Sequence, residues 1–168
     1  MPEVIIDRRI VQDTWQHWQP ELPPQGDYWF TVEEWRERRG LPYHGQLGLQ
    51  VETDQPLEEL APYLAEAALV IVRFSSFTDG RGHSLARLLR HRYGFTGELR
   101  ASGDVFRDSL HELERCGFNS FALRSGETAE NALLGLGLFS EAYQSSVAPP
   151  EPLFRRRLTG IVSRPEGD

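Results

Sequence analysis

The feature that most constrains this fold is a regular alternation of short apolar runs and helical patterns that begins at residue 47. The continuous run ALVIVRF at residues 68–74 is typical of a strand buried on both faces of a sheet. Residues 47–51, 98–101 and 119–123 predict three further strands. Strands that alternate with helices of about ten residues indicate βαβ units with right-handed crossovers. The sequence therefore predicts an α/β fold with a small parallel sheet of about four βα units, either half TIM-barrel-like or doubly wound.

Residues 1–46 predict a lead-in to this sheet. Val4–Ile6 and Ile10–Val11 indicate an N-terminal hairpin, and the aromatic, proline-rich stretch up to residue 30 is expected to form a packed cover. Thr31 and Glu34 have the spacing of a capping box, which predicts a helix that Gly40 ends. Because an open sheet edge needs a cover, we expect either the first thirty residues or a second copy, in a homodimer, to supply it.

The chain is expected to hold a single α/β domain over residues 1–144, with residues 1–46 as the lead-in and residues 47–144 as the βα units. Residues 145–168 are interpreted as a linker and C-terminal tail. The start lacks the basic and apolar regions of a signal peptide, and no apolar run approaches the length of a membrane span. The lone Cys116 has no partner for an internal disulfide. These features predict a cytoplasmic protein with no membrane partner.

The charge pattern excludes several function classes. The net charge is −7, and all 18 cationic residues are arginine, which excludes lysine Schiff-base chemistry and the lysine of a phosphate-binding P-loop. An acidic chain is also unsuited to general nucleic-acid binding. Residues 1–66 hold 13 acidic residues against 5 arginines, whereas residues 73–124 hold 9 arginines against 6 acidic residues. The cationic centre indicates an anion site or a partner surface, or simply arginines on solvated helices.

Candidate site residues lie where ligands bind in parallel α/β sheets, beyond the carboxyl ends of the strands. Three glycine-containing loops are predicted there, at Ser75–Ser84, Ser102–Asp104 and Ser125–Glu127, and each leads into a helix whose free amides favour anions. The residues predicted to bind an anion or other ligand are Arg73, Gly80, Arg81, Gly82, Ser84, Arg100 and Gly103. The predicted catalytic residues are Asp79 and Asp104.

Structural interpretations stand beside these roles. Asp104 is also placed to cap a helix, and Asp79 to shape a turn or to pair with Arg81 or Arg100. His83 fits either an acid–base group or a structural residue. The other histidines lack metal-ligand spacing, so no metal site is predicted, and no flavin, nicotinamide, haem or cluster motif identifies a cofactor.

Several of these segments together resemble a known bacterial family. They are Asp13-x-Trp15, Phe77–Arg92, Gly97–Asp108, Arg115–Phe121 and the later Tyr143-Gln144. Over these residues the chain closely resembles domain of unknown function 934, whose members are labelled as oxidoreductases involved in sulfite reduction. The resemblance implies a place beside assimilatory sulfite reductase in sulfur assimilation. His83 stands where the family frequently has an aromatic residue, and Asn119 where it frequently has aspartate.

Three hypotheses follow. The first is an accessory or anion-binding protein of assimilatory sulfite reduction, which binds sulfite, sulfate or phosphate or docks on sulfite reductase. The second is an oxidoreductase or other small enzyme of sulfite reduction that uses Asp79 or Asp104 as acid or base and Arg81 or Arg100 as the anion clamp. The third is a dimeric interaction scaffold.

Overall fold

The computed structural model describes residues 2–38 and 42–137. Its strands form one sheet in the order β2-β1-β8-β7-β6-β5-β4-β3. Strands β3 to β8 pair in parallel, whereas β1 is antiparallel to both β2 and β8. The strands are β1 (Glu3–Ile6), β2 (Arg9–Gln12), β3 (Gln16–His17), β4 (Tyr28–Phe30), β5 (Leu47–Glu52), β6 (Ala67–Phe74), β7 (Glu98–Gly103) and β8 (Ser120–Phe121).

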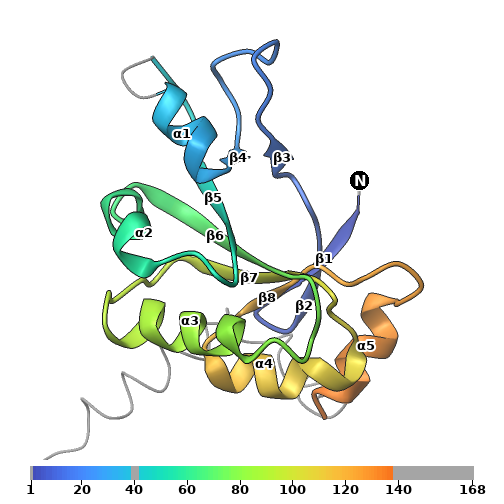
Figure 1. The fold of residues 1–168 in the computed structure, drawn as a ribbon. Helices are drawn as coiled ribbons and strands as arrows, with labels where there is room; N and C mark the ends of the chain where they lie inside the picture. The colour runs from blue at the N-terminus through green and yellow to red at the C-terminus, as the bar shows by residue number, and fades with distance from the viewer. Residues whose placement is uncertain (1, 39–41, 138–168) are drawn as a thin grey trace, which may run out of the picture.

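The helices connect successive parallel strands and cover one side of the sheet. In Figure 1, α3, α4 and α5 lie along the lower side of the strands, and α1 and α2 flank the β4–β6 end. The helical elements are α1 (Val32–Arg38), α2 (Leu57–Leu64), α3 (Gly80–His91), the short 3-10 helix η1 (Arg107–Ser109), α4 (Leu110–Cys116) and α5 (Ala129–Gly135). None of the helices in the described ranges is long and apolar enough to cross a membrane.

The strand order decides between the two predicted architectures. Parallel strands β3 to β8 follow one another in chain order, so the winding never reverses. A doubly wound sheet contains a reversal point, and this one does not. The α/β prediction and its half-barrel form are confirmed, but a sheet of about four strands is wrong. Two further parallel strands, β3 and β4, come from the stretch predicted to be only a cover, and the hairpin joins the same sheet.

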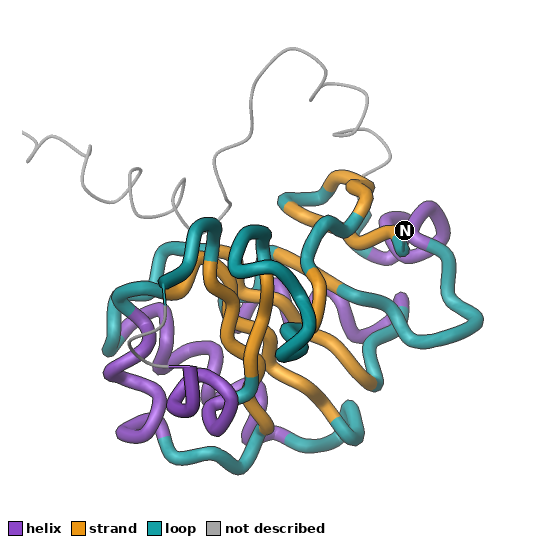
Figure 2. The backbone as a smooth tube through the Cα atoms, turned by 90° about the horizontal axis from the view of Figure 1, so that it is seen from above, coloured by secondary structure: helices purple, strands orange, loops and turns teal. Residues whose placement is uncertain are grey.

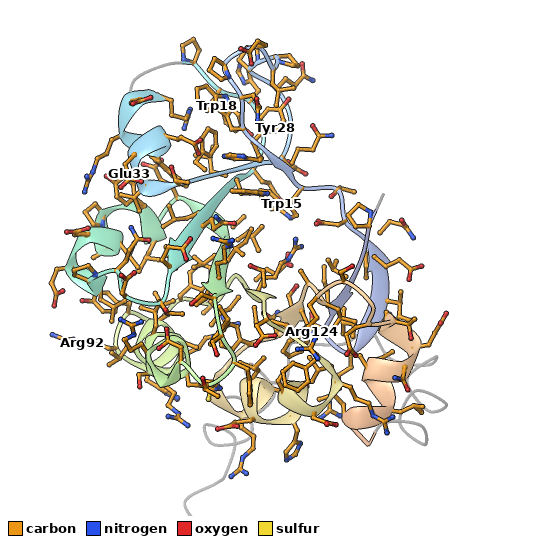
Figure 3. The ribbon with its side chains drawn as sticks, turned by 45° about the vertical axis from the view of Figure 1, so that its right-hand side comes forward. Trp15, Trp18, Tyr28, Glu33, Arg92 and Arg124 are labelled. Carbon is orange, nitrogen blue, oxygen red and sulfur yellow. The ribbon has the colours of Figure 1, made fainter. Side chains whose placement is uncertain are left out.

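The sheet must curl strongly, because the chain passes from one of its edges to the other within a few residues. Strand β2 ends at Gln12 on one edge, and β3 begins at Gln16 on the other. Four residues span at most about 14 Å, whereas seven strand spacings in a flat sheet amount to about 34 Å. The two edges therefore approach each other, and residues 13–15 cross the open side of the half-barrel. Figure 3 labels Trp15 on this crossing segment.

The main core lies on the convex side, between sheet and helices. Alternate strand residues such as Leu49, Val70 and Phe121 are fully or almost fully buried there against the helices. Figure 2 shows the strands running side by side through the molecule, with helices to the left and right of them. The concave side holds the other alternate residues, and Trp15 covers part of it with its ring against the backbone of Gly48. The first thirty residues thus cover the β8 edge of the parallel sheet, extend its other end by β3 and β4, and cover part of its open face.

Candidate functional site

The carboxyl ends of β5, β6 and β7 form a polar row on the concave side of the half-barrel. Glu52 lies beside Arg73, and Arg73 lies beside Ser102, as neighbours in the parallel register. The Arg73 side chain is 58% exposed, and its one ion pair within the described residues is a 3.5 Å contact from Nη1 to Glu52. Such an exposed, long contact contributes little energy. Arg73 is therefore a weakly engaged cation at the end of the barrel where parallel α/β folds bind ligands.

Asp79 organises the start of α3. Its Oδ1 accepts a hydrogen bond from the Arg81 backbone N–H at 3.1 Å, and its carboxylate also pairs with the Arg81 side chain and accepts from the Thr53 hydroxyl. The pairing with Arg81 and the turn-shaping role predicted for Asp79 are confirmed. Bonds from Arg81 and then Thr53 hold the pKa of Asp79 well below its usual range. The carboxylate is ionised at neutral pH, so it cannot donate a proton there.

Asp104 joins two loops rather than capping a helix. Its Oδ2 accepts the Phe77 backbone N–H at 2.9 Å, and its Oδ1 accepts from Arg124 Nη1 at 2.9 Å. The predicted helix cap is wrong, because the residue at the N-terminal boundary of η1 is Phe106. The Phe77 amide and then Arg124 lower the pKa of Asp104, so it is also ionised at neutral pH. Arg124, labelled in Figure 3, lies 4.2 Å above the Phe106 ring.

Arg100 does not lie with the other predicted anion-binding residues. It is 3% exposed, in the interior of β7 on the concave side. Its guanidinium donates to Glu98 Oε1 at 2.7 and 3.0 Å and to Asp13 Oδ2 at 2.9 Å, and its Nε also approaches the Ser120 hydroxyl. These bonds tie the crossing segment to the middle of the sheet. Arg73 lies at the end of β6 and Arg81 in the first turn of α3, and each pairs with a different carboxylate, so the three arginines form no common cluster.

The small residues of the predicted loops have identifiable local roles. Gly80, Gly82 and Ser84 lie in α3, which begins earlier than the loop boundary at Ser84 predicts. A Cβ on Gly82 would lie 2.3 Å from the Phe74 ring, so only glycine fits this close approach. Gly103 has φ +85° and would bring a Cβ to 2.1 Å from the Phe74 carbonyl oxygen. Whether any of the four contacts a ligand stays a prediction.

His83 is buried beside these loops without a polar partner. It is 8% exposed, and neither ring nitrogen has a hydrogen bond within the described residues. Its ring meets those of Phe74 and Phe77 edge-on, at centroid distances of 5.4 and 5.8 Å. The imidazole thus occupies a site built for an aromatic ring. This packing favours the structural interpretation of His83 over an acid–base role.

Sequence reasoning missed a second polar pair, at the β3–β4 end of the sheet. His17 Nε2 lies 3.0 Å from both Glu34 oxygens, and the His17 ring stacks on Trp29 at 4.1 Å. Glu34 also completes the predicted capping box with Thr31, which is confirmed. Burial raises the pKa of Glu34, but the Thr31 amide and His17 outweigh it and lower the pKa overall. The capping box was the only available signal, since nothing in the sequence links Glu34 to a histidine 17 residues away.

Cys116 lies inside the core at the end of α4, 1% exposed. Burial raises the pKa of its thiol, which keeps it protonated and unreactive at neutral pH. Among residues 2–38 and 42–137, no group of three or more histidine, cysteine, aspartate or glutamate side chains is placed to hold a metal ion.

The sequence of this chain matches a known protein family over most of its length. The model of a family described as a bacterial protein of unknown function, DUF934, matches residues 48–154. The chain belongs to the DUF934 family. The match begins in β5 and includes every predicted anion-binding and catalytic residue, whereas β1 to β4 precede it. No curated protein matches the chain. DUF934 membership therefore confirms the resemblance seen in the sequence, and the family description assigns no activity.

Proposed function

We propose that this DUF934 protein is a cytoplasmic accessory protein of assimilatory sulfite reduction that binds a small oxyanion at Arg73. The observation that carries the proposal is the weak engagement of Arg73, whose exposed side chain makes a single 3.5 Å ion pair in the part of the chain that the structure describes. Ser102 lies beside it on β7 and supplies a hydroxyl donor on the same face. A planar guanidinium with spare N–H groups matches two oxygens of sulfite, sulfate or phosphate.

The resemblance to the sulfite-reduction family supports the choice of ligand class and of sulfite reductase as the partner. The electrostatics weigh against an enzyme that uses Asp79 or Asp104 as a general acid, because both carboxyls have lowered pKa values. Cys116 alone is a poor redox group, since it is buried and protonated. The oxidoreductase hypothesis therefore requires a redox group that the protein binds, and a visible absorbance spectrum of gently purified protein tests it directly.

Isothermal titration with sulfite, sulfate and phosphate tests the anion site. We expect one of these oxyanions to bind the wild-type protein, and Arg73→Gln to weaken binding at least tenfold. Arg87→Gln is the matched control, because Arg87 is an exposed arginine on α3. Absence of binding by the wild type, or equal loss in both variants, would overturn the site. Co-purification with sulfite reductase tests the partner separately.

A further inference from the structure

Arg38, the last residue of α1, is a buried cation without a counterion in the part of the chain that the structure describes. It is 8% exposed. Residues 1–66 hold 13 acidic residues, yet within the described ranges the Arg38 guanidinium forms no ion pair and donates no hydrogen bond. By contrast, Arg8 and Arg36 each donate to a side-chain oxygen. Burying a charge without such a partner is unfavourable, so an anion bound to Arg38 would stabilise it.

Two aromatic rings hold this guanidinium in place. Its Cζ lies 5.1 Å from the centroid of the Phe30 ring and 4.7 Å from that of the Tyr43 ring, and the two rings stand at 76° to each other. Phe30 is fully buried, and the Tyr43 hydroxyl donates to the Gly26 carbonyl, so both rings are fixed without help from the arginine. Cation–π contacts use the ring faces and none of the N–H groups. The guanidinium is therefore positioned while its five donors stay available.

The guanidinium remains within reach of the surface. Among the described residues, only the two ring nitrogens of His83 are both fully shielded and without a hydrogen-bond partner, so the nitrogens of Arg38 keep some exposure. Helix α1 runs back from the end of β4 toward the start of β5, as Figure 1 shows, and Arg38 therefore lies at the amino ends of these strands. Arg73 lies at the carboxyl end of β6, so the two arginines belong to separate sites.

The surroundings of Arg38 select a class of anion. A guanidinium presents parallel N–H groups in one plane, which match the two oxygens of a carboxylate. Phe30 and Tyr43 contact it directly, and the partly buried ring of Trp18 lies 5.3 Å from that of Phe30. Aromatic rings pack well against an apolar group, whereas a sulfate or phosphate would lose hydration without gaining that contact.

We propose that Arg38 binds the carboxylate of a small organic acid, with the apolar body of the acid beside the Tyr43 ring. The guanidinium supplies the charge and the paired donors, and the rings supply its orientation and the apolar surface. This second anion site is independent of the oxyanion site proposed at Arg73, because the two lie at opposite ends of the parallel strands.

Isothermal titration with benzoate tests the site, with benzamide as its uncharged equivalent. We expect benzoate to bind the wild-type protein saturably, and binding to be at least tenfold weaker for benzamide or in Arg38→Met. Arg36→Met is the matched control and should bind benzoate like the wild type, because Arg36 is an exposed arginine of the same helix that donates to the Tyr63 hydroxyl. No saturable binding by the wild type, equal binding of benzamide, or equal loss in both variants would overturn the proposal.

Chemical labelling of the wild-type protein tests the same site without a substitution at Arg38. Phenylglyoxal modifies accessible guanidinium groups, and peptide mass spectrometry follows each arginine separately. We expect saturating benzoate to slow the modification of Arg38 at least fivefold and to leave that of Arg36 unchanged. Protection by sulfate as strong as that by benzoate would contradict the choice of a carboxylate, and an Arg38 that benzoate does not protect would overturn the site.

Discussion

At the scale of single residues, His83 is a polar side chain in an apolar site. Its two ring nitrogens are buried, and neither has a hydrogen-bond partner among residues 2–38 and 42–137. An unsatisfied buried polar group costs about 1–3 kcal/mol, so His83→Phe should raise the free energy of unfolding by about that amount. Urea denaturation measures it. His111→Phe, on the exposed side of α4, should bring no such gain. A destabilised His83→Phe protein would show that the imidazole has a partner that the packing does not reveal.

Asn119 shows why one departure from the family pattern fits this chain. Its Oδ1 accepts from Arg90 and from the Leu99 amide, while its Nδ2 donates to Asp7 at 3.2 Å. An aspartate here would keep the Arg90 contact but would face the Asp7 carboxylate. We expect Asn119→Asp to lower the free energy of unfolding by about 1–3 kcal/mol at pH 7. Adding Asp7→Asn should restore most of the loss. Equal stability of Asn119→Asp and wild type would contradict this account.

Asp79, in the β6–α3 loop, makes the stability of the fold depend on pH. Because its pKa is depressed in the folded state by Arg81 and Thr53, its charged form stabilises the fold above the unfolded pKa. That stabilisation is lost as the pH falls below about 4, the usual range for aspartate. Asp79→Asn keeps a capping side chain but not the charge. The thermal unfolding midpoint of the wild type should therefore be higher than that of Asp79→Asn at pH 7, and the two midpoints should converge in acid. A difference that persists unchanged in acid would rule out the charge as its source.

Side-chain partners could be predicted from the sequence only where they are close along the chain. Asp79 and Arg81 are two residues apart, and their pairing follows from a local turn. Asp104 meets Phe77 and Arg124, 27 and 20 residues away, so sequence reasoning had only its position before a helix and assigned a cap. Arg100 was predicted to lie with the other anion-binding residues at the carboxyl ends of the strands. It lies elsewhere because the curl that turns it toward Asp13 depends on the whole sheet.

At the scale of elements, long periodic segments were predictable and short strands were not. The apolar run of β6 and the hairpin of β1 and β2 follow from local pattern. Strands β3 and β4 have only two and three residues, too few to show a period. Strand β4 becomes a strand by pairing with β5, and β3 by pairing with β4. The aromatic side chains of this stretch were predicted to pack as a cover, and Tyr28 and Phe30 are indeed buried. The same stretch also extends the sheet, which the sequence did not indicate.

The buried ion cluster around Arg100 is the main tie between the crossing segment and the sheet. Removing Arg100 would leave the Asp13 and Glu98 carboxylates without their cation, and breaking a buried pair in this way costs about 3–5 kcal/mol. We expect Arg100→Met to show that loss in chemical denaturation and to expose Trp15 to chymotrypsin. Arg73→Met, which removes only an exposed pair, should change stability by less than about 1 kcal/mol. Similar effects of both variants would contradict a structural role for the cluster.

At the scale of the whole molecule, the first twelve residues cover the β8 edge of the parallel strands. Strand β1 covers the β8 edge and places Ile5, which is fully buried, in the main core. Deleting residues 2–12 removes both, and the bare β8 edge should then drive aggregation, seen by light scattering. Ile5→Ala separates the two causes, because it loses about 2–5 kcal/mol of core packing while the edge stays covered. We expect Ile5→Ala to remain free of aggregates. The shortened chain could also stay free of aggregates and lose no more stability than Ile5→Ala. That result would show that β1 does not act by covering the β8 edge.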